Sequence, residues 1–309
     1  MATTRREHDV VGNQCSMTLL PRSIPLSFLL ALALAGCGGG NERAEYPSTQ
    51  STDPTADEMG LASADAGTAE AEPRAEEAAP APPPPMVVQG VTTAIEGATP
   101  SLRVTAPRAN QTIRSGPVMV RFNLQHWELA SPMGPHVHVI VDNEPYIAVR
   151  ATEPFDLAAL VQANLGHPLA EGTHVLRMFP SRGQHESVKD AGAFAVVVFH
   201  YGHATEGFSF DPSAPLLTFS RPKGCNPTST HVLLDFFVAN AELGTDSYRV
   251  RYTLDGTTGL ITAWLPHYLE NLSAGEHTIR LELLDVAGNP VPGMFNDTTR
   301  TFTVADTCP

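Results

Sequence analysis

Two histidines, His136 and His138, stand two residues apart in a run of valines within GPHVHVIVDNEP, residues 134–145. Residues two apart on an extended strand point to the same side and lie about 6.5–7 Å apart, so the two imidazoles could chelate one Zn²⁺ or Cu²⁺ ion. A third ligand could come from His185 or Asp142, and the spacing does not choose between them. The competing interpretation is a histidine pair on the solvated face of a sheet, because an HxH pattern alone is common.

A second stretch is also dense in side chains that could bind or react. It reads FPSRGQHESVKDAGAF, residues 179–194, and includes His185. Its place between two predicted strands, where binding residues are often found, makes Arg182, Glu186 and Lys189 a candidate binding loop.

The sequence assigns no catalytic residue. A hydrolase needs a base beside a nucleophile, and His185 near Ser187 is too common a combination to indicate one. The chain has no GxSxG, no HExxH, no phosphate-binding glycine loop and no dinucleotide fingerprint. We therefore expect a protein that is not an enzyme.

The elements that must position these side chains are strands, because hydrophobic residues recur at every second position. Three pairs of segments carry the same pattern in both halves of the chain: VMVRFNLQHWEL (118–129) with VLLDFFVANAEL (232–243), VHVIVDN (137–143) with VRYTLDG (250–256), and LAEGTHVLRM (169–178) with LSAGEHTIRL (272–281). The second half of the chain is therefore a repeat of the first.

Short alternating strands and turns rich in Gly, Pro, Asn and Asp predict an all-β fold of two tandem immunoglobulin-like β-sandwiches. We place the first sandwich at residues 99–203, a linker at 204–213 and the second sandwich at 214–309. The first copy carries an insertion, ATEPFDLAALVQANLGHP, that predicts a short helix with Asp156 as its cap and Gly166 as its terminator.

The second copy resembles the bacterial immunoglobulin-like or fibronectin-like domains of surface proteins, on LSAGEHTIRLELLDVAGNPVPG followed by TFTVAD. The resemblance is weaker in the first copy. It implies a binding or structural role, although folds of this kind carry many functions. We expect recognition through the first copy, because its insertion, its HxH strand and its charged loop are where the two copies differ.

The repeat also separates the histidines into two kinds. His174 is matched by His277 at the same turn of the second copy, which indicates a structural role, such as an imidazole bonded to loop backbone. His136 and His138 are matched instead by the arginines of YRVRYTL. This face of the strand is therefore polar in both copies, so we expect the two histidines to be exposed and the neighbouring valines to face the core.

Residues 1–36 resemble a secretory signal peptide, because the apolar run IPLSFLLALALA is too short to span a membrane and ends in small residues. The following LAGC, residues 34–37, resembles the lipobox of bacterial lipoproteins. That resemblance implies cleavage before Cys37 and acylation of this cysteine, with palmitate among its lipids. Translation could begin at Met17. By analogy with a rule in which aspartate at the next position retains a lipoprotein in the inner membrane, Gly38 indicates the outer membrane.

Residues 37–98 are rich in Ala, Pro and Glu and nearly lack aromatic residues, which predicts a disordered tether after the lipidated cysteine. A flexible chain of this length spans roughly 40–45 Å root-mean-square. We therefore expect the folded part to stand well away from the bilayer.

Charge and cysteine content limit the partners. The formal charge of −14 argues against nucleic acid and leaves the lipid as the means of membrane attachment. After Cys37 the only cysteines are Cys225 and Cys308. Outside the cytoplasm they could form a disulfide, worth about 4 kcal/mol in the chain-entropy model, and two free thiols are the alternative.

The chain most resembles an envelope lipoprotein, and we expect no cofactor beyond its covalent lipid. We expect a non-catalytic binding or structural role, with an envelope protein or a glycan as partner. The alternative is a periplasmic or surface Zn²⁺ or Cu²⁺ module that uses His136, His138 and, as third ligand, His185.

Overall fold

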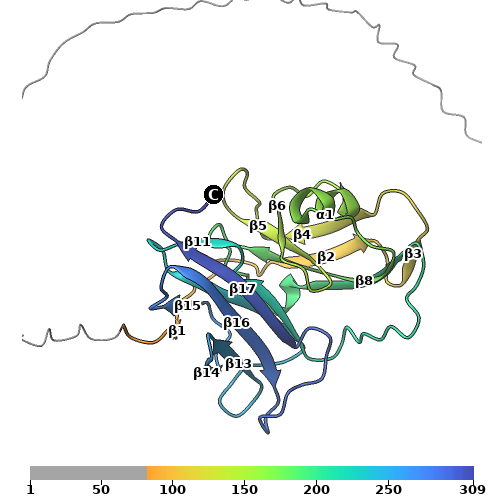
Figure 1. Ribbon diagram of the computed structural model, residues 1–309. Helices are drawn as coiled ribbons and strands as arrows, with labels where there is room; N and C mark the ends of the chain where they lie inside the picture. Colours follow the sequence, from red (N-terminus) through yellow and green to blue (C-terminus); the bar gives the residue numbers. More distant parts are fainter. Residues whose placement is uncertain (1–81) are drawn as a thin grey trace, which may run out of the picture. The chain divides into compact units, whose positions relative to one another are not determined.

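The computed structural model describes residues 82–309, which form two β-sandwiches (Figure 1). The predicted signal peptide, Cys37 and most of the predicted tether lie outside the described residues. The regular secondary structure of the described part is nearly all strand, and this part belongs to one compact unit, so the predicted all-β fold class is confirmed. No helix within residues 82–309 is long and apolar enough to cross a membrane.

The first sandwich has a sheet of three strands and a sheet of five. The first sheet contains, in order, β2 (Ser101–Ala106), β4 (Met119–Gln125) and β7 (Phe155–Asp156). The second contains β3 (Gln111–Ile113), β9 (Ala195–Tyr201), β8 (Gly172–Ser181), β5 (His136–Val141) and β6 (Ile147–Val149). Every pair is antiparallel except β3 with β9. Alternate residues of the two sheets meet in one core, as their period of two predicts.

The insertion of the first sandwich forms the helix that its sequence predicts, α1 (Leu157–Leu165). The Asp156 carboxylate accepts a hydrogen bond from the Ala158 amide at 3.1 Å, and Gly166 ends the helix with φ of 80°. A single 3-10 turn, η1 (Ala191–Ala193), precedes β9.

The second sandwich repeats the two-sheet plan. One sheet contains, in order, β1 (Met86–Gln89), β15 (His267–Glu270), β12 (Val232–Ala239) and β10 (Leu216–Arg221). The other contains β11 (Cys225–Pro227), β17 (Asp297–Ala305), β16 (Gly275–Leu284), β13 (Arg249–Leu254) and β14 (Thr257–Ile261).

The end of the predicted tether is ordered, which corrects its boundary at residue 98. Residues 86–89 form β1, which pairs antiparallel with β15 and adds an edge strand to the second sandwich. Val87 packs against the core of that sandwich. The compositional signal for disorder fails here because MVVQ supplies apolar side chains that a sheet edge can bury.

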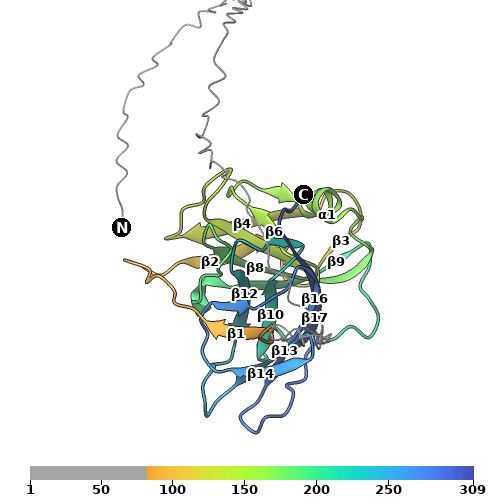
Figure 2. The ribbon, with the colours of Figure 1, turned by 60° about the vertical axis from the view of Figure 1, so that its left-hand side comes forward.

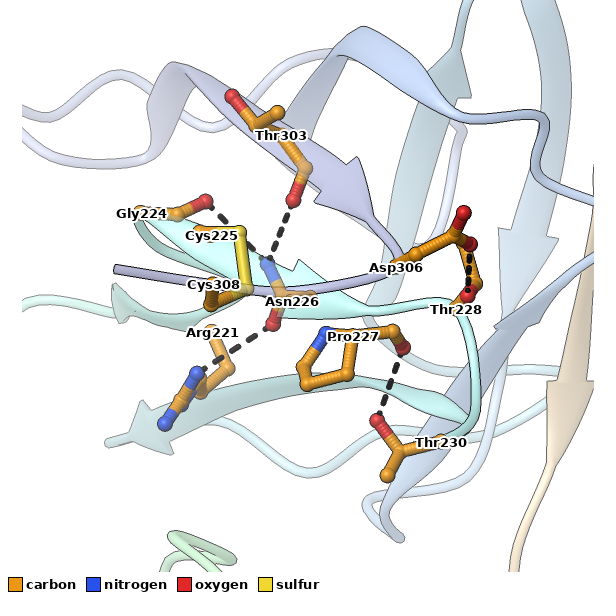
Figure 3. Close-up of a disulfide and its surroundings, with 10 residues drawn as sticks. All are labelled: Arg221, Gly224, Cys225, Asn226, Pro227, Thr228, Thr230, Thr303, Asp306 and Cys308. Carbon is orange, nitrogen blue, oxygen red and sulfur yellow. Dashed lines mark hydrogen bonds between the residues drawn. A yellow bond between two sulfur atoms is a disulfide. The ribbon is translucent and has the colours of Figure 1, made fainter.

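A disulfide joins Cys225 and Cys308, with their Cα atoms 5.5 Å apart (Figure 3). It lies where β11 pairs in parallel with β17, so it ties the start of the second sandwich to its last strand. Asn226 lies in the same small region and donates to the backbone oxygens of Gly224 and Thr303.

The two sandwiches share a third apolar cluster, which is separate from their own cores. Its buried members come from both: Ile140, Tyr146, Val175, Phe179, Leu216, Phe237, Ala239 and Phe295. Arg177 of β8 is also buried there, with its guanidinium 3.8 Å from the centre of the Phe295 ring and a hydrogen bond to Thr218. The outer face of β5 and β8 is thus covered by β10 and β12 of the second sandwich. Figure 2 shows β8 next to β10 and β12.

Candidate metal centre

His136 and His138 lie on β5, and both are fully buried, with 0% of their surface exposed. The prediction that they are exposed is therefore wrong. They do point away from the core of the first sandwich, as their alternation with the valines requires. The matching arginines, Arg249 and Arg251, are half-buried on the second copy, whereas the equivalent face of the first copy is covered by the second sandwich.

His185 reaches the same point from the loop after β8. Its Nδ1 lies 2.9 Å from Nε2 of His136, and Nε2 of His138 lies 3.0 Å from that same atom. One ring nitrogen from each of the three histidines falls within 4.8 Å of the other two. The structure therefore brings together all three residues predicted as ligands.

Asp142, the other candidate for the third ligand, serves a different residue. Its carboxylate accepts from Nδ1 of His174 at 2.8 Å and from the amide of Val175 at 2.9 Å. His277 repeats this arrangement with Asp255, at 2.6 Å. The structural role predicted for His174 from its match with His277 is what the geometry shows.

The loop that carries His185 passes close to the segment before β5. A Cβ atom on Gly183 would lie 3.2 Å from the Cα of Gly134, so the absence of a side chain at Gly183 lets the two segments approach. Gly134 itself has a φ of +126°, a conformation that side chains disfavour, and a Cβ there would lie 2.7 Å from the Cβ of Ala130.

Hydrogen bonds orient the rings of the β5 histidines. Nδ1 of His136 lies 2.9 Å from the carbonyl oxygen of Gly134, which can only accept, so this nitrogen carries the proton and Nε2 keeps its lone pair. Nδ1 of His138 lies 3.0 Å from the hydroxyl of Ser220, on β10 of the second sandwich. Both Nε2 atoms are therefore directed at the cluster.

The three imidazoles are neutral at ordinary pH. Burial lowers the pKa of His136 and holds the pKa of His138 well below 6.5. Burial, followed by the charge of Arg221, lowers the pKa of His185 to about 3. The neutral imidazole is the form that binds metal ions.

Two of the three separations between the nitrogens suit ligands of one ion, and the third is within 4.8 Å. With bonds of about 2.0–2.1 Å, two nitrogens stand about 3.3 Å apart around a tetrahedral Zn²⁺, and about 2.9 Å apart around a square-planar Cu²⁺. The two measured distances, 2.9 and 3.0 Å, lie at the lower end of this range.

Tyr146 completes the surroundings and was missed by the sequence analysis. Its ring stacks on that of His138 with centres 3.6 Å apart, and its hydroxyl lies 3.0 Å from Nδ1 of His185. Burial raises the pKa of Tyr146 to about 12. The pairing of β5 with β6 could have indicated Tyr146. If the register of this hairpin is continued by one pair, Ile140 on β5 lies opposite Tyr146, which places the tyrosine on the same face as the two histidines.

Cations flank the cluster. Arg150 donates to the same Gly134 carbonyl that His136 uses, at 2.8 Å. Lys223 of the second sandwich donates to the carbonyl of Tyr146 at 2.7 Å and lies 3.9 Å from the centre of its ring. The charge of Arg221 lowers the pKa of all three histidines.

The predicted binding loop is not a free surface, which corrects that prediction. Glu186 is buried, pairs with Arg182 at 3.6 Å and accepts a hydrogen bond from Thr92 near the end of the predicted tether. Lys189 forms a buried ion pair of 2.7 Å with Asp235 of the second sandwich. These side chains diverge between the two copies because they hold the sandwiches and the tether together.

Ser187, weighed as a nucleophile beside His185, is buried as well. Its hydroxyl donates to Asp235 at 2.9 Å, whereas the ring of His185 contacts Tyr146 and His136. The two side chains therefore belong to different groups of contacts.

No family model matches the chain, and no curated protein matches it. Among solved structures, the fibronectin(III)-like modules of CbhA from Clostridium thermocellum are 11% identical over 66% of this chain and 93% of theirs, with a TM-score of 0.23. SGBP-B from a Bacteroides ovatus mixed-linkage glucan utilization locus is 10% identical over 70% of each chain, with a TM-score of 0.17. At such TM-scores these likenesses carry no argument, and the fold described above rests on the strands themselves.

Proposed function

We propose that this chain is a lipid-anchored envelope protein that binds one Zn²⁺ or Cu²⁺ ion without catalysing a reaction. The ion would be held by His136, His138 and His185. The observation that carries the proposal is the meeting of three ring nitrogens at 2.9 and 3.0 Å in a buried place.

Protons alone satisfy this arrangement poorly. Nε2 of His136 offers a single in-plane lone pair, because its Nδ1 carries the proton that Gly134 accepts. That one lone pair faces two nitrogens, those of His138 and His185. A cation between the three rings accepts a lone pair from each, whereas a proton can be shared fully along only one of the two contacts.

The donor set favours a borderline transition metal. Imidazole suits Zn²⁺ and Cu²⁺, whereas Mg²⁺ and Ca²⁺ take oxygen ligands. Full burial of His136 and His138 also leaves a substrate little access to the ion from their side. This supports a non-catalytic role.

Two parts of the proposal rest on the sequence. The LAGC motif supports acylation of Cys37 and attachment to the bacterial envelope, and Gly38 supports the outer membrane. Recognition of a protein or glycan by the first sandwich has less support, because Arg182, Glu186 and Lys189 are engaged inside the molecule.

Calorimetric titration of the full chain with Zn²⁺ and with Cu²⁺ tests the metal site. We expect binding at micromolar Kd or tighter, lost when His136→Ala and His138→Ala are combined. A matched control removes two exposed histidines of the same sandwich, His167 and His203, and should bind as the wild type does. The single variant His185→Asn tests the site with less disturbance of packing, because His185 is only half-buried.

Two results would contradict the metal site. One is a wild-type protein that binds neither ion. The other is an affinity that stays the same in the double variant and in His185→Asn while circular dichroism shows that both are folded.

A further inference from the structure

The second sandwich contributes a side chain to the surroundings of the histidine cluster. Ser220, at the end of β10, is 3% exposed, and its hydroxyl lies 3.0 Å from Nδ1 of His138. The two residues are 82 positions apart in the chain. This contact therefore exists only while the two sandwiches are docked.

The hydroxyl can accept from Nδ1 of His138, which is the arrangement that a metal ion on Nε2 requires. When Ser220 accepts from Nδ1–H, the lone pair of His138 lies on Nε2, which faces the cluster. Without an acceptor at Nδ1, the buried ring gains by moving its proton to Nε2 and donating it to His136. That tautomer has no lone pair to offer to a metal ion at Nε2.

Other contacts of the same segment hold Ser220 in place. Thr218, two residues earlier on β10, accepts from Arg177 of the first sandwich at 3.0 Å. Lys223, three residues later, donates to the backbone of Tyr146. The disulfide at Cys225 then ties the segment to β17 (Figure 3).

We propose that the second sandwich is part of the metal centre: Ser220 holds His138 in the metal-binding tautomer, so ion binding and docking of the two sandwiches stabilise each other. This inference rests on the proposed metal site. A partner that fixes the second nitrogen of a ligating histidine typically changes metal affinity by about 10–100-fold. Linkage requires the effect to be reciprocal, so the ion must also favour the docked arrangement.

The test compares three variants of the full chain in the same Zn²⁺ titration. Ser220→Ala should bind Zn²⁺ about 10–100-fold more weakly than the wild type. Ser220→Thr keeps the hydroxyl and should restore most of the affinity. Ser247→Ala removes a hydroxyl whose hydrogen bond, to the carbonyl of Glu242, lies within the second sandwich, so it should bind Zn²⁺ as the wild type does.

Amide hydrogen exchange gives a second measurement that needs no variant. Zn²⁺ should slow exchange in residues 216–221, which form β10, because the ion favours the docked state. A merely structural role for Ser220 would lower stability equally with and without Zn²⁺ and would leave the Kd unchanged.

The outcomes separate this inference from the proposed function. If the wild type binds neither Zn²⁺ nor Cu²⁺, the proposed metal site and the inference about Ser220 are both contradicted. If the wild type binds Zn²⁺, the inference alone is overturned by equal affinity in Ser220→Ala, by equal weakening in Ser247→Ala, or by exchange in β10 that Zn²⁺ leaves unchanged.

Discussion

The role of each buried imidazole follows from what its two nitrogens face. Nδ1 of His174 faces the Asp142 carboxylate and its Nε2 faces the carbonyl of Ala170 at 2.8 Å, so both nitrogens donate and the ring is an imidazolium. The rings of His136 and His138 each have one nitrogen directed at another imidazole, and burial lowers the pKa of both, so they stay neutral. One residue type thus serves as a charged support and as a candidate ligand in the same sheet.

The ion pair of His174 predicts a pH dependence of stability. Burial would lower the pKa of His174, but the hydrogen bond and charge of Asp142, helped by Ala170, raise it above its ordinary value of 6.5. A folded-state pKa above the unfolded one stabilises the fold fully below the unfolded pKa, and this contribution is lost as pH rises through the folded pKa. The free energy of unfolding should therefore lose this contribution as pH rises above 6.5.

Asp142→Asn isolates this effect, because asparagine can still accept from the amide of Val175. At pH 5 the variant should unfold with about 1–3 kcal/mol less free energy than the wild type, and the gap should narrow above pH 8. Urea denaturation at several pH values measures both. Glu206→Gln, which removes the same charge from an exposed side chain, is the control. A gap that stays constant with pH would refute the role assigned to the imidazolium.

At the scale of elements, alternation predicted the strands but not what covers them. The pattern of β5 is the same whether its polar face meets water or another domain, so His136 and His138 were placed correctly on that face and wrongly in solvent. The covering surface comes from β10, and nothing in the sequence of β10 indicates which strand it covers. Contacts between separate folding units depend on how whole faces fit, which a local period cannot encode.

The edge strand β1 shows a second limit of prediction from sequence, because residues predicted to be disordered form a strand. Four residues, MVVQ, pair with β15 although the segment before them has the composition of a disordered chain. The composition of a sequence window long enough to detect disorder hides so short an apolar run. An edge strand, in turn, needs only one neighbouring strand to satisfy half of its backbone hydrogen-bonding groups. Residues 86–89 therefore belong to the second sandwich.

The disulfide between Cys225 and Cys308 should raise the free energy of unfolding. Replacing both cysteines, Cys225→Ser with Cys308→Ser, should lower the free energy of unfolding by about 4 kcal/mol, because the cross-link closes a loop of about 84 residues. Urea denaturation of the full chain measures the change, and wild-type protein treated with a reductant should lose a similar amount. An unchanged urea midpoint in the double variant would show that the cross-link does not stabilise the fold.

At the scale of the whole molecule, the candidate site is assembled from three distant segments. β5 supplies two histidines, the loop after β8 supplies the third, and β10 supplies the hydroxyl that fixes one of them. The sequence predicted the three ligands by residue type and by the mismatch between the two copies. It could not predict their convergence, because that depends on a register between β5 and β8 and on the docking of the second sandwich.

The proposed attachment of the whole molecule to a membrane depends on one residue, Cys37. If Cys37 is acylated, cells fed a labelled palmitate should incorporate the label, and the protein should sediment with membranes. Cys37→Ser should abolish the label and release the protein, because the proposed lipid is its anchor. Cys15→Ser is the matched control: it removes the other cysteine of the first 40 residues and should change neither result. Label that persists in Cys37→Ser, or a wild type without label, would contradict the lipoprotein interpretation and leave the metal site, which rests on other residues, to be judged by its own titration.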